Sequence, residues 1–283
     1  MNIDAGTRLT SATAHGKHGH SLIGETKFRQ LYGLALQLQM AGEREESLRG
    51  REAALAGVVA DLQDGDAAIA DFSASLGNIL RVPATMSVSR PSFADRVIDA
   101  LGQALADRMR NTGRITAIFF DPAQSSALLQ EARAMAIAGK LPVILVEAGI
   151  AKPQRRAAKK KKIREAALEY PSIPVDAHDV IAMYRVAHES IARAREGNGP
   201  THIVGVRWQL PSQNARRRTA NPASQDAVLH LEEWLMARGL PAQQWRCEIV
   251  AQLAAPKDEQ RPAAQNAAAV AIGDEDAQTR AIA

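Results

Sequence analysis

The sequence predicts an α/β protein whose mostly parallel sheet is covered by helices on both faces. Apolar strands at 115–120 (ITAIFF) and 141–149 (LPVILVEAG) are separated by a helix-length segment, and strand, helix and strand return in order within 173–208. The 283 residues are 46% hydrophobic but only 4% aromatic. Strands that alternate with helix-length spacers are typical of a parallel sheet in a three-layer α/β/α arrangement.

Three helices are expected before the first of these strands. Segment 25–43 carries an apolar helical face made by Phe28, Leu31, Leu34, Ala35 and Leu38. Segment 50–66 is interpreted as a second helix that Asp-Gly-Asp stops, and 90–113 as a third. In the third, Ser92 is a plausible N-cap, while Asn111 and Gly113 mark the end.

The remaining elements follow the same alternation. A helix is expected at 123–140, and a basic segment at 152–170 follows the second strand. Segment 173–208 is interpreted as a short strand, an Asp-rich turn, a long amphipathic helix, a glycine-rich stop and a strand. Segment 223–253 is interpreted as two helices joined at Gly239-Leu240-Pro241.

Composition limits the class of protein. Cys247 is the only cysteine, so no intrachain disulfide can form, and no apolar run is long enough to span a membrane. The first twenty residues lack the apolar core of a signal peptide, so a cytoplasmic location is expected. We predict a flexible N-terminal tail (1–24), one α/β domain (25–255) and a flexible C-terminal tail (256–283). The histidine tract 15–20 could bind a metal, but the interpretation as a solvated tail is favoured.

Asp121 lies where the strand 115–120 passes into the next helix. Ligands of parallel sheets bind at the carboxyl ends of strands, where helix N-termini offer free amides and a positive dipole end. Asp121 is therefore a candidate ligand-binding acid. The alternative is structural, because Asp followed by Pro is a common helix start with Asp at N-cap and Pro122 at N1.

Three other candidate sites have simpler interpretations. The basic run 155–166 lacks aromatic side chains that could stack on bases, so a solvated loop is favoured over a nucleic-acid site. Asp176, His178 and Asp179 suggest a metal or a catalytic pair, but a helix-entry turn with Asp179 near the N-cap is favoured. Ser125 and Ser126 lack the glycine-flanked elbow of a hydrolase. His188 and His230 have no obvious partner.

Four segments together carry a family resemblance. Segment 50–73 runs without a gap along a family stretch that begins Gly-Gln-Glu-Ala and ends Tyr-Arg, and 114–150 along a stretch from Gly-Asp-Gly to Asn-Asn. Segment 175–200 is similar to the Val-Asp-Gly-x-Asp-Val turn, its helix and a Gly-Pro stop, and 224–245 to a closing helical pair. In these segments the chain resembles the α subunit of thiamine-diphosphate-dependent 2-oxo acid dehydrogenases of the pyruvate, branched-chain and acetoin types.

The resemblance implies a thiamine-diphosphate-binding fold of the diphosphate-domain type. In that family the α subunit binds the cofactor's diphosphate through magnesium, held by the acid of Gly-Asp-Gly, an asparagine and a backbone carbonyl. A β subunit completes the site in an α₂β₂ assembly. Asp121 stands at the motif acid and is thus the expected cofactor-binding and metal-binding residue. A β-type subunit, a second copy of the chain, or both are the expected partners; no specific nucleic acid and no membrane is expected.

The cofactor motif departs from the family at most of its positions. Phe120 and Pro122 replace the flanking glycines. The other family positions are also changed. Gly149 and Ile150 replace the Asn-Asn pair, and Phe72 and Ser73 replace the Tyr-Arg pair. Ser75 replaces a histidine, and Gln213 lies near the position of the histidine in the family's late loop. No catalytic residue is assigned.

These losses predict weak cofactor binding. Each hydrogen bond to a charged group contributes roughly 1.5–3 kcal/mol, so losing an arginine, a metal ligand and an amide removes on the order of 5–8 kcal/mol. That is about four to six decades of affinity. We therefore expect an α-subunit-like component of a 2-oxo acid dehydrogenase with lost or much weakened thiamine diphosphate and magnesium binding. A non-catalytic scaffold or regulatory relative is the alternative.

Overall fold

The computed structural model describes residues 23–70, 85–86, 92–122, 126–149, 171–206 and 226–254. Almost all of both predicted tails, the basic run 155–166, and positions 72, 73, 75, 150 and 213 lie outside this part of the chain. Within it, no helix is both long and apolar enough to cross a membrane. Cys247 is exposed.

A parallel sheet forms the centre of the described structure. Its strands pair in the order β2-β1-β3-β4-β6-β5, and every pairing is parallel. The strand bounds are β1 Ala67–Ala70, β2 Thr85–Met86, β3 Thr116–Phe120, β4 Val143–Glu147, β5 Ser172–Asp176 and β6 Thr201–Val206. The predicted strands are confirmed, while β1 and β2 were not predicted.

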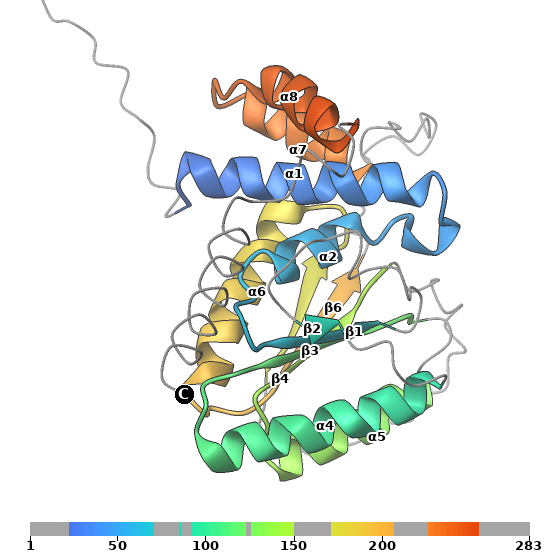
Figure 1. Ribbon diagram of the computed structural model, residues 1–283, viewed down its shortest axis with the longest axis vertical. Helices are drawn as coiled ribbons and strands as arrows, with labels where there is room; N and C mark the ends of the chain where they lie inside the picture. The colour runs from blue at the N-terminus through green and yellow to red at the C-terminus, as the bar shows by residue number, and fades with distance from the viewer. Residues whose placement is uncertain are drawn as a thin grey trace, which may run out of the picture.

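Helices cover both faces of this sheet (Figure 1). Their bounds are α1 Glu25–Gly42, the 3₁₀ helix η1 Glu46–Leu48, α2 Glu52–Val59, α4 Phe93–Arg110, α5 Ser126–Ala138, α6 Val180–Arg195, α7 Ala227–Met236 and α8 Ala242–Ala254. Helices α4 and α5 lie together on one face, and α2 and α6 on the other. The predicted three-layer α/β/α class is confirmed, with α1, α7 and α8 stacked as a further layer outside α2.

Two hydrophobic cores hold these layers. The smaller core lies beneath α4 and α5 and contains Ile118, Phe120 and Leu145 from the sheet. The larger core lies on the opposite face, where alternate strand residues such as Phe119 and Val146 meet α2, α6 and the outer helices. Neighbouring residues of one strand therefore point into different cores, which explains why these strands are continuously apolar.

Local signals set several helix ends. Asp179 Oδ1 accepts from the Ala182 amide at 2.9 Å and caps α6, and Asp226 caps α7 in the same way. Asn111 ends α4 in the left-handed conformation, with φ of 53°. Ser92 is at the N-cap position of α4, but its side chain makes no capping hydrogen bond.

The helix predicted at 50–66 is shorter than expected. Helix α2 ends at Val59, and a turn leads into β1 at Ala67. Asp66 fixes this turn: its carboxylate accepts from the Gln63 amide at 2.7 Å and from the Ile115 amide at 3.0 Å. The side chain of Asp66 therefore binds one backbone amide of the turn and one just before β3, so residues 60–66 form a turn where the sequence predicted helix.

Candidate functional site

The predicted ligand edge exists at the carboxyl ends of β3 and β4. Phe120 pairs with Glu147 in the parallel register, and the Ala148 amide donates to the Phe120 carbonyl at 2.9 Å. Asp121 and Gly149 thus follow adjacent strand ends, as the sequence predicted. Asp121 is buried, with 8% of its surface exposed.

Asp121 is not the N-cap of the following helix. Helix α5 begins at Ser126, five positions beyond Asp121, so the prediction of Asp121 at N-cap and Pro122 at N1 is wrong. The Asp121 carboxylate instead binds a side chain that the sequence analysis did not assign. Arg51 Nη2 donates to Asp121 Oδ2 at 2.9 Å, and only 14% and 11% of the two side chains are exposed.

Arg51 is fixed from several sides. It occupies the N-cap position of α2, and its Nε donates to the Ala148 carbonyl at 3.2 Å, while its Nη1 donates to the Ser47 carbonyl. One guanidinium thereby joins the start of α2, the end of β3 and the end of β4. Gly149 (φ of 118°) passes close to it, since a Cβ placed there would lie 3.7 Å from Arg51 Nε.

Glu52, the neighbour of Arg51, is also engaged within the protein. Its Oε1 accepts from the Gly50 amide at 3.1 Å, and burial raises the pKa of the Glu52 carboxyl above its ordinary value. The start of α2 therefore brings the Arg51 cation to this edge, next in sequence to a buried acid, and hydrogen bonds hold both side chains.

The described residues do not fit a magnesium-bound diphosphate. Magnesium takes a near-octahedral shell of oxygens, usually with one or two carboxylates. Asp121, the carboxylate expected for it, is bound to a guanidinium, and Pro122 has no amide to donate. Among the described residues, no group of three or more His, Cys, Asp or Glu side chains could hold a metal.

A second polar cluster lies on β4, β5 and β6. His202 is buried, with Nε2 2.9 Å from Glu147 Oε1 and Nδ1 3.2 Å from Ser172 Oγ. A serine, histidine and carboxylate in line can serve nucleophilic catalysis. Here Ser172 is the first residue of the edge strand β5, where ordinary strand pairing holds it rather than a strained elbow. The cluster therefore ties the edge strand to the centre of the sheet.

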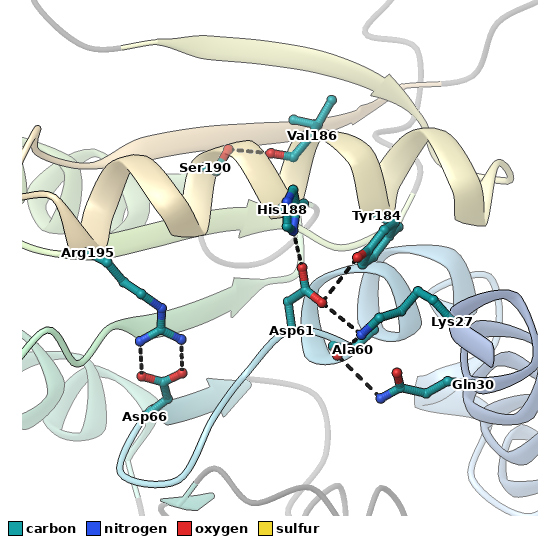
Figure 2. Close-up of polar contacts among 10 residues, drawn as sticks. All are labelled: Lys27, Gln30, Ala60, Asp61, Asp66, Tyr184, Val186, His188, Ser190 and Arg195. Carbon is teal, nitrogen blue, oxygen red and sulfur yellow. Dashed lines mark hydrogen bonds and ion pairs between the residues drawn. The ribbon is translucent and has the colours of Figure 1, made fainter. Parts of the chain in front are cut away.

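A third cluster surrounds Asp61, just beyond the C-terminal end of α2 and thus at the opposite end of that helix from Arg51. Asp61 accepts from Lys27 Nζ at 2.9 Å and from the Tyr184 hydroxyl at 3.2 Å, and lies 2.5 Å from His188 Nδ1 (Figure 2). The expectation that His188 lacks a partner is wrong. These side chains come from α1 and α6, so Asp61 joins three helices.

The remaining sequence candidates have structural roles. Asp179 caps α6, and Asp176 Oδ1 accepts from the His178 amide at 3.0 Å, which confirms the helix-entry interpretation of residues 175–180. Arg195 bonds Asp66 through two nitrogens, at 3.0 and 2.6 Å (Figure 2). None of these residues lies at the carboxyl ends of β3 and β4.

Fold and site together define an α/β protein with an internal ion pair, Arg51–Asp121, at its candidate ligand edge. Residues 84–209 match the family model described as "Dehydrogenase E1 component". The resemblance predicted from the motifs is thereby confirmed: the chain is similar to the α subunits of pyruvate, branched-chain and acetoin dehydrogenase E1 components, at modest identity.

Three of the similar proteins illustrate the match. The α subunit of acetoin:2,6-dichlorophenolindophenol oxidoreductase from Bacillus subtilis is 31% identical over 141 residues, covering 47% of this chain and 42% of that protein. The α subunit of the pyruvate dehydrogenase E1 component from Acholeplasma laidlawii is 30% identical over 118 residues, covering 39% and 34%. The α subunit of 3-methyl-2-oxobutanoate dehydrogenase from Mycobacterium tuberculosis is 29% identical over 153 residues, covering 52% and 41%. The chain thus spans less than half the length of these relatives.

Among the solved structures that are similar in part is a putative thiamin diphosphate-dependent enzyme isolated from Mycobacterium smegmatis, 16% identical, with a TM-score of 0.39. The match covers 56% of this chain and 32% of that one.

Proposed function

We propose that this chain is an α-subunit-like component of a 2-oxo acid dehydrogenase-type assembly that binds magnesium and thiamine diphosphate weakly or not at all. The observation that carries the proposal is the Arg51–Asp121 pair. The Asp121 carboxylate, which would have to bind the metal, is already paired with the guanidinium of Arg51 from the same chain.

The geometry makes this cation hard to displace. Magnesium would have to separate a guanidinium and a carboxylate that are both nearly buried, and would leave the Arg51 charge without its partner. Removing one member of a buried ion pair costs about 3–5 kcal/mol, because the other charge stays desolvated. This cost makes the binding free energy of the metal less favourable, so a magnesium diphosphate would bind more weakly.

The sequence around Arg51 supports the same conclusion. The family stretch that Gly50-Arg51-Glu52-Ala53 follows begins Gly-Gln-Glu-Ala, so a neutral amide is replaced by a cation at position 51. This replacement comes in addition to the phenylalanine, proline, glycine and isoleucine at the other motif positions. The added charge at position 51 and the loss of donors at the other motif positions therefore both weaken the binding of a magnesium diphosphate.

Without cofactor chemistry, the role of the chain would be to assemble with other subunits. The relatives are α subunits of E1 components, which favours a β-type subunit as the partner. Such a chain would act as a scaffold, stabilising or regulatory subunit. An active α subunit, whose partner supplies the donors missing here, is the second candidate, favoured by the family match itself.

Isothermal titration calorimetry with magnesium and thiamine diphosphate tests the proposal. The wild-type chain should give no saturable heat at micromolar cofactor, both alone and with a co-purified β-type subunit. Arg51→Gln removes the internal cation and should bind Mg²⁺, or Mn²⁺ observed by electron paramagnetic resonance, more tightly than wild type. Arg29→Gln is the matched control, because Arg29 pairs with Glu248 on the outer helices. Tight saturable heat from wild type would refute the proposal.

A further inference from the structure

Helix α4 carries an apolar stripe on its solvent side. Ile98, Leu105 and Met109 are 57%, 44% and 79% exposed. Together with Gly102 they are spaced by four, three and four residues, the spacing that keeps side chains on one helical face. Single exposed apolar residues are ordinary, but a continuous stripe indicates an interaction surface.

The centre of the stripe is open to close approach. A Cβ built at Gly102 meets no atom within 4 Å. Figure 1 shows α4 at the outside of the fold, beside α5 and on the far side of the sheet from α1, α7 and α8. The absence of a side chain at Gly102 lets a large side chain of a partner helix reach the α4 backbone.

Charges flank the stripe with opposite sign at its two ends. Asp95 and Asp99 lie toward the N-terminal end of α4, and Arg110 is its last residue; all three are exposed. At 3.6 residues per turn they fall on the same flank of the stripe. An acidic end and a basic end on one flank make the surface complementary to an inverted copy of itself.

We propose that α4 packs antiparallel against α4 of a second copy of this chain, about a twofold axis that passes between Gly102 and Leu105. In this register Leu105 of each copy sits over Gly102 of the other, and Ile98 lies opposite Met109. Arg110 then comes within a turn of the partner's Asp95 and Asp99. A parallel pairing would instead gather Arg108 and Arg110 of both copies at the same end of the helix pair, where like charges repel.

The contact goes beyond the proposed function, because it concerns self-association and does not depend on cofactor binding. Helix α5 packs beside α4 and also exposes an apolar side chain, Met135, at 52%. An 18-residue helix spans roughly 27 Å. One helix pair of this length gives a small interface, so dimerisation should depend on protein concentration.

Sedimentation equilibrium of the full chain tests the apolar part of the contact. Wild type should show a monomer–dimer equilibrium, and Leu105→Glu should raise the dimer dissociation constant at least about tenfold. Met236→Glu is the matched control, since Met236 is 41% exposed on α7, away from α4, and its substitution should leave the equilibrium unchanged. Circular dichroism checks that each variant is folded.

A charge reversal tests the antiparallel register. Arg110→Glu should weaken the dimer, as should Asp95→Lys with Asp99→Lys, while the chain carrying all three changes should recover it. If the other two variants lost the dimer because they misfold, the triple variant, which contains all their changes, would lose it too. Recovery of the dimer therefore shows that the charges pair. Failure of the triple variant to recover would overturn the register.

Other outcomes overturn the contact itself. A wild-type chain that stays monomeric at every concentration would do so, as would a dimer unaffected by Leu105→Glu. A monomeric wild type whose binding to a β-type subunit is abolished by Leu105→Glu would assign the stripe to that partner and reject the second copy.

Discussion

Arg51 Nη2 lies 2.9 Å from Asp121 Oδ2, so two residues that are 70 positions apart form a nearly buried ion pair at the carboxyl ends of β3 and β4. The pair joins the only predicted cofactor-binding acid to the start of α2. It gives Asp121 a structural role, as a tie between α2 and the sheet, in place of the helix-capping role suggested by the sequence.

Arg51→Gln and Asp121→Asn should each lower the free energy of unfolding by about 3–5 kcal/mol, because either change removes one member of a nearly buried ion pair. Urea denaturation of the two variants and of the double variant measures the coupling, which should be about 1–2 kcal/mol. Arg29→Gln, which removes a more exposed pair, should change the free energy by less than about 0.5 kcal/mol. Purely additive losses would show that the two side chains do not interact.

Gly57→Ala should destabilise the protein although alanine normally favours helices. A Cβ at Gly57 would lie 2.8 Å from the Tyr184 amide nitrogen and 2.9 Å from Met183 Cβ, so α2 would have to move away from α6. We expect a loss of about 2 kcal/mol or more in the free energy of unfolding. Gly33→Ala is the control in α1: its Cβ would make an ordinary 3.6 Å contact with Ile249, and stability should rise by up to about 1 kcal/mol.

The Asp61 cluster should make stability depend on acid pH. Burial alone would raise the pKa of Asp61, but hydrogen bonds from His188 and Lys27 outweigh it and hold this pKa below the ordinary value of 3.8. A lowered pKa contributes stability above the ordinary value, which is lost as the pH falls through the folded-state pKa. Asp61→Asn should therefore flatten the dependence of the free energy of unfolding on pH below about pH 5. An unchanged acid slope in this variant would contradict the prediction.

Two of the three tyrosines should ionise late in an alkaline titration. Burial and the Glu232 carboxylate raise the pKa of Tyr32 to about 12, and burial and Asp61 raise that of Tyr184 to about 12. The folded protein then holds these protons after the unfolded chain has lost them, so stability falls as the pH rises from about 10 to about 12. Phenolate absorbance at high pH should show one late-ionising group fewer in Tyr184→Phe. A titration centred at pH 10 for every tyrosine would rule out this environment.

Sequence patterns predicted the main layers because their signals are local. The apolar face of α1, the continuous apolar runs of β3 and β4, and the cap at Asp179 each lie within a few neighbouring residues. Strand β1, with the sequence Ala-Ala-Ile-Ala, carries only one residue with a strong strand preference, so sheet pairing rather than propensity defines it. Asp66 accepts a hydrogen bond from the distant Ile115 amide in the turn that follows α2, a contact that no local pattern contains.

The candidate site was predicted only in part. The position of Asp121 followed from strand order, but its partner Arg51 lies on another element, and only the replacement of glutamine by arginine in the Gly-Gln-Glu-Ala stretch could have indicated it. The partner of His188 was missed for the same reason, since Asp61 is 127 positions away. The fold alone brings such residues together.

The decisive measurement is a crystal structure of the wild-type chain after soaking with magnesium and thiamine diphosphate. We predict that Arg51 still bonds Asp121 and that no diphosphate density lies at the ends of β3 and β4. A magnesium ion ligated by the Asp121 carboxylate, with Arg51 turned away, would contradict this prediction.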